Sequence, residues 1–403
     1  MGETSITGTG ALHTPAVHTA PNELEVLGTD VTLIAPLRTL AEADLGIRLN
    51  FTVLDGIEAQ RRGALQPDSF DIYDQWFHDL DLVWPARSLK PIDVNRIDRW
   101  SEILELPVFS SGKHGEELGS NPRDLLFVQA DGELKHVQSD SISMLPTVYN
   151  ADSFAVIGAG ARANAGSWAD LLSSEWCGRV AIQADAAIGV LDLLLAMQAG
   201  NRFQVRDIGN LDLAEIEQFI RLVRESQLRG QFYGFWTDTV PELGPDDPPI
   251  LSTMWWANFL ALRARGVQVE MCTPAEGYRG WFGGMALSRC LSGRRMDIAY
   301  EYLNWWLSGG PGALMARNGA YAATPQATRS VLAPAEWDFW YEGKAAACDM
   351  KDPFGNVVFR KGERREGGAS AARLSRIVTW NSVMDEHNLL VRLWEAITRD
   401  GLL

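Results

Sequence analysis

The stretch that decides the fold is "LEVLGTDVTLIAPLRTLAEADLGIRLNFTVLDGIEAQRRGALQPDSFDIYDQW", from Leu24 to Trp76. Short apolar or β-branched runs alternate in it with segments of helical spacing, one of which closes on Gly46 as a helix C-cap. The strand-like runs are Leu24–Thr29, Ile47–Leu54 and Phe70–Trp76. Alternating strands and helices predict an α/β fold with a mostly parallel sheet flanked by helices.

Polar and aromatic side chains follow these strands where each strand ends. Ligands of parallel sheets bind beyond the carboxyl ends of the strands. Thr29, Gln75 and Trp76 lie at such ends and are therefore candidate ligand-binding residues.

A second α/β layer begins after Asn150. In "SWADLLSSEWCGRVAIQAD" (Ser167–Asp185), Ser167 and Asp170 have the spacing of a helix N-cap, Gly178 closes the helix, and a strand ends at Asp185. A strongly apolar helix, "AAIGVLDLLLAMQAG", follows it. Since 403 residues are also too many for one compact core, we expect two α/β lobes.

Composition excludes several classes of protein. The formal net charge of -16 argues against a nucleic-acid partner, because phosphate binding needs a basic face. The six histidines show no metal-ligand spacing, and we expect neither a metal nor another cofactor. No run of 18 apolar residues occurs. The four cysteines form no C-x-x-C pair, and whether any two form a disulfide stays open; they are Cys177, Cys272, Cys290 and Cys348.

Six further segments carry a resemblance to a known family. They are "FDIYDQW" with "LKPIDVNRI", "LPTVYNADSF", "GSWADLLSSEWCGRVAIQAD", "MWWANFLALRARGVQVEMCTPAEGYRGWFGGMAL" and "DIAYEYLNWWLSGGPGALMARNGAYAATP". In this order, from about Leu24 to Pro325, they resemble family 1 extracellular solute-binding proteins of ABC importers, nearest the spermidine/putrescine-binding group. The C-terminal stretch resembles only a subset of that family.

The resemblance implies a two-lobe periplasmic-binding-protein clamp of type II-like form, with hinge crossovers and a ligand cleft between the lobes. The crossings are expected near 147–150, 276–280 and 328–333. The first lobe would then hold 23–147 plus 282–327, and the second 150–276 plus 332–403, after a flexible lead over 1–22. The glycines of Glu276–Gly280 would absorb the rotation of closure.

The same resemblance implies a function. The chain would be a monomeric protein without enzymatic activity that delivers a small organic solute to the membrane subunits of an ABC permease. It would act in the periplasm or outside the cell after removal of a signal peptide; the residues alone leave a cytoplasmic location open.

The expected binding residues start with two tryptophans. Trp281 would project into the cleft as a platform, or else pack between the lobes. Trp256 would face it, and Trp255 would point the other way, because neighbours on an extended chain face opposite sides; one of the pair is then expected in the core. Asp185 would hold an ammonium group or merely cap the next helix. Thr237 would contact the ligand or serve as a turn residue.

Departures from the polyamine-binding pattern bear on the ligand. Ile188 and Gly283 stand where the resembled group has further acids, and Gly28 stands where it has an aromatic residue. Tyr278 and Arg279 are expected beside the cleft, and Asp140 is expected to line it from the first lobe.

An acid facing a base suits a zwitterionic amino-acid derivative or an opine-like compound better than a long polycation. The expected solute is one of these or a small amine. Polyamine, thiamine or a phosphonate remain alternatives. Arg279 or the basic loop 361–376, whose role stays open, could serve an anion such as a phosphonate. A hydrolase or other enzyme on an α/β scaffold is the alternative of another class, although no G-x-S-x-G motif occurs.

Overall fold

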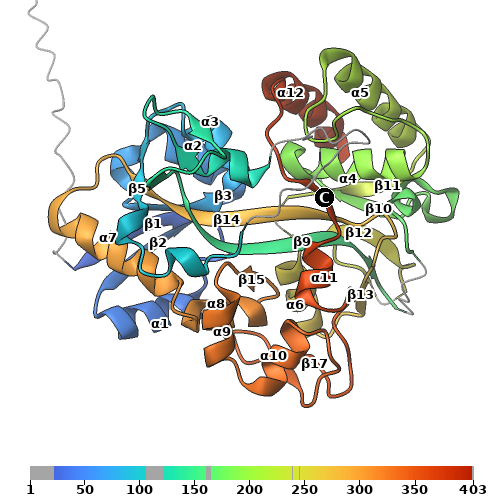
Figure 1. Cartoon of the computed structure of the whole chain (residues 1–403). Coiled ribbons are helices and arrows are strands. Elements are labelled where there is room, and N and C mark those ends of the chain that lie inside the picture. The colour runs from blue at the N-terminus through green and yellow to red at the C-terminus, as the bar shows by residue number, and fades with distance from the viewer. Residues whose placement is uncertain (1–21, 106–120, 160–164, 238, 245, 402–403) are drawn as a thin grey trace, which may run out of the picture.

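The computed structural model describes residues 22–105, 121–159, 165–237, 239–244 and 246–401. All of the lead except Asn22 lies outside these residues. Among them, one 12-stranded sheet follows the order β11-β10-β12-β9-β14-β3-β1-β2, with β4, β13, β15 and β18 paired beside this path. Figure 1 shows the two ends of this sheet, each with its own helices, on opposite sides of the molecule.

The first half of the sheet contains three parallel strands, β1 (Glu23–Gly28), β2 (Arg48–Val53) and β3 (Ile72–Trp76). Helices α1 (Ala35–Leu45) and α2 (Gly56–Leu65) connect them. The predicted alternation is confirmed here, and so is the C-cap: Gly46 has φ 64° and donates its N–H to the Glu42 carbonyl. Asp55 caps α2 by accepting the Glu58 N–H.

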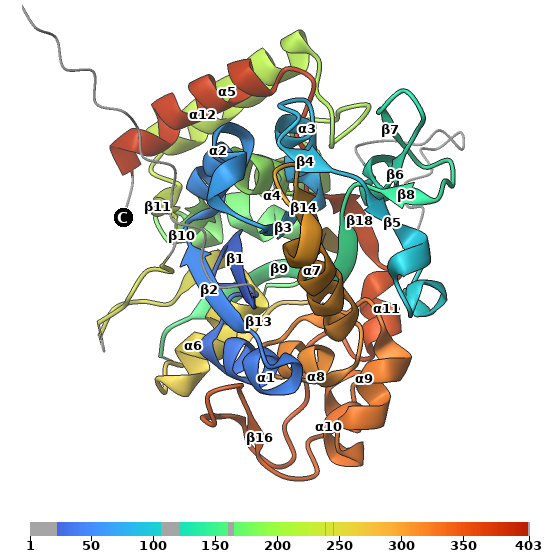
Figure 2. The ribbon, with the colours of Figure 1, turned by 90° about the vertical axis from the view of Figure 1, so that its left-hand side faces the viewer.

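The second half has three further parallel strands, and its longest helices cover one face of the sheet. The strands are β10 (Val180–Gln183), β11 (Phe232–Trp236) and β12 (Ile250–Met254). These helices are α4 (Ala186–Ala199), α5 (Leu213–Leu228) and α12 (His387–Thr398), whereas α6 (Trp256–Ala264) lies on the other side, against β13 (Val269–Met271) and β17 (Val357–Phe359). Helices α5 and α12 lie side by side (Figure 2), with the rings of Phe219 and Trp394 6.3 Å apart.

The segment after Ser167 differs from its prediction. It forms two 3₁₀ turns, Trp168–Leu172 and Ser174–Trp176, rather than an α-helix. The predicted cap is present, since Asp170 accepts the Ser167 N–H at 3.0 Å. Tertiary contacts hold the short turns: the indole N–H of Trp168 donates to the Gly277 carbonyl at 2.8 Å.

Two long strands join the halves. β9 (Leu145–Ile157) pairs with β14 (Tyr278–Ser288) along its first part and with β12 and β13 (Val269–Met271) along its last part. Figure 1 shows β9 and β14 side by side across the middle of the molecule. Two of the expected crossings, near 147–150 and 276–280, fall in or next to these strands. The lobe boundaries themselves stay a prediction.

The glycines at the start of β14 have a packing role. Strand β18 (Ile377–Trp380) runs parallel to Tyr278–Gly280. A Cβ atom on Gly277 would lie 2.3 Å from the Arg376 carbonyl oxygen, and one on Gly280 would lie 2.8 Å from atoms of Ile377 and Trp380. These glycines therefore permit the close approach of β18.

The remaining elements are short or peripheral, and the crossing expected near 328–333 falls at the end of α9. A small sheet contains β5 (Ile92–Asp93), β8 (Ser141–Ile142), β6 (Phe127–Val128) and β7 (Leu134–Lys135). The others are α3 (Leu80–Val83), β4 (Leu89–Lys90), α7 (Gly293–Trp306), α8 (Gly310–Arg317), β15 (Tyr321–Ala322), α9 (Pro325–Val331), α10 (Pro334–Trp340), the hairpin β16 (Met350–Lys351) and β17 (Val357–Phe359), and α11 (Ser370–Leu374).

Candidate functional site

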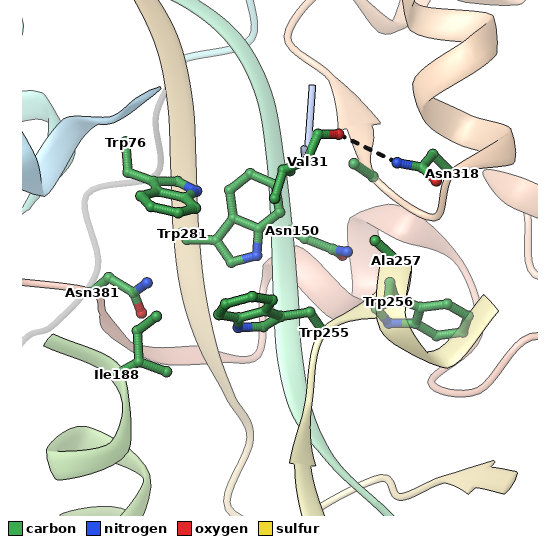
Figure 3. A pocket seen from close by; sticks show the side chains of 11 residues that line it. Val31, Trp76, Asn150, Ile188, Trp255, Trp256, Ala257, Trp281, Asn318 and Asn381 are labelled. Atoms are coloured by element: carbon green, nitrogen blue, oxygen red, sulfur yellow. Dashed lines mark hydrogen bonds between the residues drawn. The ribbon is translucent and has the colours of Figure 1, made fainter. Parts of the chain in front are cut away.

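Three indole rings converge between the two halves of the sheet. Trp76 ends β3, Trp281 lies on β14, and Trp255 directly follows β12. Figure 3 shows the three rings around one space, with Asn150 and Asn381 at its edges. This cavity is tight, with about 20 Å³ of room for the centres of water molecules. This cavity is too small for an organic ligand, which would need the larger space that adjoins it.

That larger space is an open cleft of about 570 Å³, which we call the cleft; it shares Trp76 and Trp255 with the indole cavity. One wall is the start of α2, and the other contains Gln183, Thr237 and the last turn of α12. The charged side chains that line the cleft are Asp55, Glu58, Asp185, Glu395 and Arg399. Four carboxylates thus face one guanidinium group. Arg61 pairs with Glu58 at 2.9 Å, and the other three carboxylates still outnumber Arg399, which favours a cationic ligand.

Trp281 is held in place by its ring N–H. It is 7% exposed, and Nε1 donates to Asp152 Oδ2 at 2.6 Å. Burial raises the pKa of Asp152 to about 6, although the Arg279 charge and this hydrogen bond lower it. Since Trp281 both packs between the halves and lines the indole cavity, the two roles expected from the sequence are not exclusive.

Of the two adjacent tryptophans, Trp256 is the one that lies in the core. Trp256 is 1% exposed, and its ring carries the Arg365 guanidinium at 4.0 Å from the ring centre. Figure 3 shows this ring turned away from the other three. Trp255 is half-buried, packs edge-on against Trp236 at 5.5 Å and lines the cleft. Trp256 also lines the indole cavity, but Arg365 lies against its ring, so Trp255 is the one of the pair that borders the cleft. The part of Trp256 in ligand binding stays a prediction.

Asp185 combines the two roles that the sequence left open. Its carboxylate accepts the Ala187 N–H at 2.8 Å and so caps α4, yet it also lines the cleft. Burial raises the pKa of Asp185, and the nearby Asp55 raises it further. Thr237 is exposed at the cleft, where its carbonyl accepts a hydrogen bond from Gln183 Nε2 at 3.2 Å.

Arg279 and Tyr278 do not line the cleft. Arg279 is fully buried, and its Nε donates to Asp192 Oδ1 at 2.7 Å while another nitrogen donates to Asn381 Oδ1 at 2.6 Å. Tyr278 is also fully buried and donates its hydroxyl to Glu366 at 2.7 Å. Both predictions are wrong, because internal carboxylates already engage these side chains.

The structure also moves three other candidates away from the cleft. Asp140 is exposed beside the small sheet, where its carbonyl accepts the Val94 N–H, so its predicted position in the cleft is wrong. Thr29 is 5% exposed and receives the Leu33 N–H on its carbonyl. Gln75 is 3% exposed and donates to the Gly56 carbonyl at 3.4 Å, which places it behind the cleft rather than in it.

Other observations concern metals, cysteines and membranes. In the described part of the chain, no three His, Cys, Asp or Glu side chains are grouped as metal ligands. Cys177, Cys272, Cys290 and Cys348 are all free thiols in the structure. No helix within the described ranges has the length and apolar character needed to cross a membrane.

Comparison with known proteins gives a fold. No protein-family model matches the sequence, and no curated protein sequence matches it significantly. A Listeria monocytogenes protein that carries the name of a spermidine/putrescine ABC transporter is 14% identical, with a TM-score of 0.61 over 93% of this chain and 99% of its own. The TpPotD lipoprotein of Treponema pallidum is 11% identical, with a TM-score of 0.59 over 93% and 97%.

A third structure is the PBP AgtB of A. tumefaciens R10 in complex with agropinic acid. It is 10% identical, with a TM-score of 0.53 over 94% of this chain and 96% of its own. These similarities confirm the predicted fold class: the chain has the two-lobe α/β fold of the substrate-binding proteins of ABC transporters.

Proposed function

We propose that this protein is the solute-binding component of an ABC importer and that it captures a small organic amine in the cleft. The observation that carries the proposal is the cleft itself. It lies between the two halves of the sheet, has indole walls at Trp76 and Trp255, and is lined by more carboxylates than cations. Indole faces attract ammonium groups, and carboxylates form charge-assisted hydrogen bonds with them.

The charge distribution favours an amine over a zwitterion. A zwitterionic or opine-like solute was expected because Arg279 was placed opposite an acid. Asp192 engages that guanidinium in the interior, which leaves Arg399 as the only cationic side chain among the described residues that line the cleft. Asp55 and Glu395 supply negative charge to the cleft in place of the acids that are missing at Ile188 and Gly283, whereas Glu58 is paired with Arg61.

The fold supports capture by closure. The two halves would rotate about β9 and β14, with the lobes divided as 23–147 plus 282–327 and 150–276 plus 332–403. Closure would surround the solute and exclude water from its contacts. The proposed partners are the membrane subunits of an ABC permease, and the proposed location is the periplasm or the cell exterior. The protein would act as a monomer after removal of a signal peptide.

The test is a binding panel measured by isothermal titration calorimetry. It contains n-butylamine, putrescine, spermidine, a zwitterionic amino acid, agropinic acid, thiamine and methylphosphonate. We expect amines to bind, and Trp255→Ala to weaken that binding at least tenfold, whereas Trp100→Ala, on a turn away from the cleft, leaves it unchanged. Tight binding of an anion or zwitterion with no amine binding would overturn the amine proposal.

Mass spectrometry of the recovered solute addresses the enzyme alternative, since a chemically changed solute would contradict a binding role.

A further inference from the structure

A smaller chamber opens from the deep side of the cleft. It offers about 100 Å³ for the centres of water molecules and shares Trp76, Asp185 and Glu395 with the cleft. The first half of the molecule contributes Asp79 and the start of α2, and the second half contributes the start of α4 and one side of α12. We call this space the side chamber. One water needs roughly 10–15 Å³ on this measure, so the side chamber has room for several waters or one small head group.

Asp79 has a buried carboxylate oxygen to which the described part of the fold supplies no hydrogen-bond donor. It is 4% exposed and lines the side chamber. Its Oδ1 accepts from Gln60 Nε2 at 2.9 Å, whereas its Oδ2 is buried and has no hydrogen-bond partner among the described residues. A buried carboxylate oxygen without a donor is costly and calls for a partner that the protein itself does not supply.

The groups around Asp79 do not balance its charge. His78 Nε2 lies 3.6 Å from Asp79 Oδ1, but burial lowers the pKa of His78 to about 3, so this ring is neutral. Burial also lowers the pKa of His387, on the opposite wall. Burial, together with the Asp185 carboxylate, raises the pKa of Asp79 well above its ordinary value. No lysine or arginine occurs among the described residues that line the side chamber.

The walls suit a flat cation. Trp76 stacks on His78 with the ring planes at 14°, and it forms a boundary shared by the cleft and the side chamber. A Cβ on Gly56 would lie 2.8 Å from Cζ3 of Trp76, so the glycine makes room for the edge of the indole beside α2. A planar guanidinium can stack on an indole and donate to a carboxylate at the same time.

We propose that the side chamber is a second binding subsite for a solute with a cationic group at each end. It holds one guanidinium or primary ammonium head, while the other head stays with the carboxylates of the cleft and the chain between them lies along Trp76. A solute with a single ammonium group stays in the cleft, where more carboxylates line the space. The inference rests on the proposed function, since it extends the same solute. Asp79 Oδ2 accepts from the head group, and Asp185 lies at the entrance to both spaces. Because the two halves of the molecule build the side chamber together, the subsite exists only when they are apposed.

The test compares three probes of equal chain length on the full chain by calorimetry: agmatine, putrescine and n-butylamine. We expect agmatine and putrescine to bind at least tenfold more tightly than n-butylamine. Asp79→Asn should remove this advantage and leave n-butylamine binding unchanged. The control Asp140→Asn, outside the cleft, should change none of the three. Titrations in buffers of different ionisation enthalpy should also show proton release with agmatine and not with n-butylamine, because a bound cation lowers the pKa of Asp79.

The outcomes separate the two proposals. Equal affinity for all three probes, with no proton release, overturns the subsite and leaves the amine-binding function standing. No binding of any probe overturns the proposed function and the subsite with it. If Asp79→Asn does not fold, the comparison of the three probes and the proton release of the unaltered protein still decide the question.

Discussion

Replacing Arg279 by methionine should lower the free energy of unfolding of the protein, and this loss should not depend on solute binding. The guanidinium and its partner Asp192 are both fully buried, and Arg279 lies on the strand that joins the halves. Methionine keeps most of the aliphatic volume but leaves the Asp192 carboxylate buried without its cation. Burial already raises the pKa of Asp192, and the Arg279 charge is the largest influence that lowers it.

The magnitude follows from this burial. Breaking a buried ion pair by removing one partner costs about 3–5 kcal/mol, because an uncompensated charge remains. The side-chain oxygen Oδ1 of Asn381 also loses the hydrogen bond that it accepts at 2.6 Å, which adds about 1 kcal/mol. We therefore expect Arg279→Met to lower the free energy of unfolding by about 4 kcal/mol or more. Adding Asp192→Leu should restore a large part of it, since the stranded charge is then gone.

Urea unfolding followed by tryptophan fluorescence measures this effect, and Arg96→Met is the matched control. Arg96 forms an Arg–Asp pair of the same chemistry with Asp297, but its side chain is 40% exposed and that of Asp297 is 57% exposed. Arg96 also lies over the Tyr300 ring, 3.6 Å from its centre, so its loss should cost about 1–2 kcal/mol in all, still well below the loss of the buried pair. The reasoning is refuted if two results occur together: the free energy of unfolding of Arg279→Met lies within about 1 kcal/mol of that of the unaltered protein, and the affinity for the solute falls tenfold. The limit of about 1 kcal/mol is the typical value of an exposed ion pair. These two results together would return Arg279 to the role in ligand contact predicted from the sequence.

Three further predictions follow from single side chains. Trp255→Ala should weaken amine binding at least tenfold with little loss of stability, whereas Trp256→Ala should cost about 3–5 kcal/mol of stability; calorimetry and urea unfolding separate the two, and the reverse pattern would restore the original assignment. Gly280→Ala forces a methyl group to within 2.8 Å of its neighbours and should cost about 1–3 kcal/mol. Gly166→Ala, with open space around it, should be nearly neutral in the same unfolding assay. The pKa of His78 is about 3 in the folded state, so below its ordinary value near 6.5 only the unfolded chain takes up the proton. Relative to His78→Gln, the unaltered protein should lose about 3 kcal/mol between pH 6.5 and pH 4, and equal pH profiles of the unfolding midpoint would contradict this.

The sequence predicts those parts of the fold that local chemistry controls. Strands β1, β2 and β3 carry β-branched and apolar residues between turn signals, and the structure places them within two residues of their predicted bounds. The turns after Ser167 differ because distant groups decide them. The Glu276 carboxylate accepts the Trp168 N–H, and the Trp168 ring donates to the backbone next to it. Spacing within the segment contains no information about such bonds.

The candidate site shows the same division between local and distant control. Trp76 was identified because it ends a strand, and Asp185 because it ends a strand and starts a helix. The direction of Trp255 and Trp256 depends on Arg365, which lies more than a hundred residues further along the chain. The alternation of side chains along an extended chain predicts that Trp255 and Trp256 point in opposite directions. Which of the two rings borders the cleft depends on where Arg365 lies.

The charge of the cleft cannot be inferred from the few positions at which this sequence lacks an acid that the polyamine-binding group has. Ile188 and Gly283 lack the expected acids, and considered alone they point away from a cationic solute. The cleft nevertheless has two walls, and its composition is the sum over both. Helix α2 contributes Glu58 at one wall, and α12 contributes Glu395 at the other, on elements that no short motif connects. A binding preference is therefore a property of the surfaces that the fold brings together, and a carboxylate lost from one element can be replaced in space by one from an element far away in the sequence.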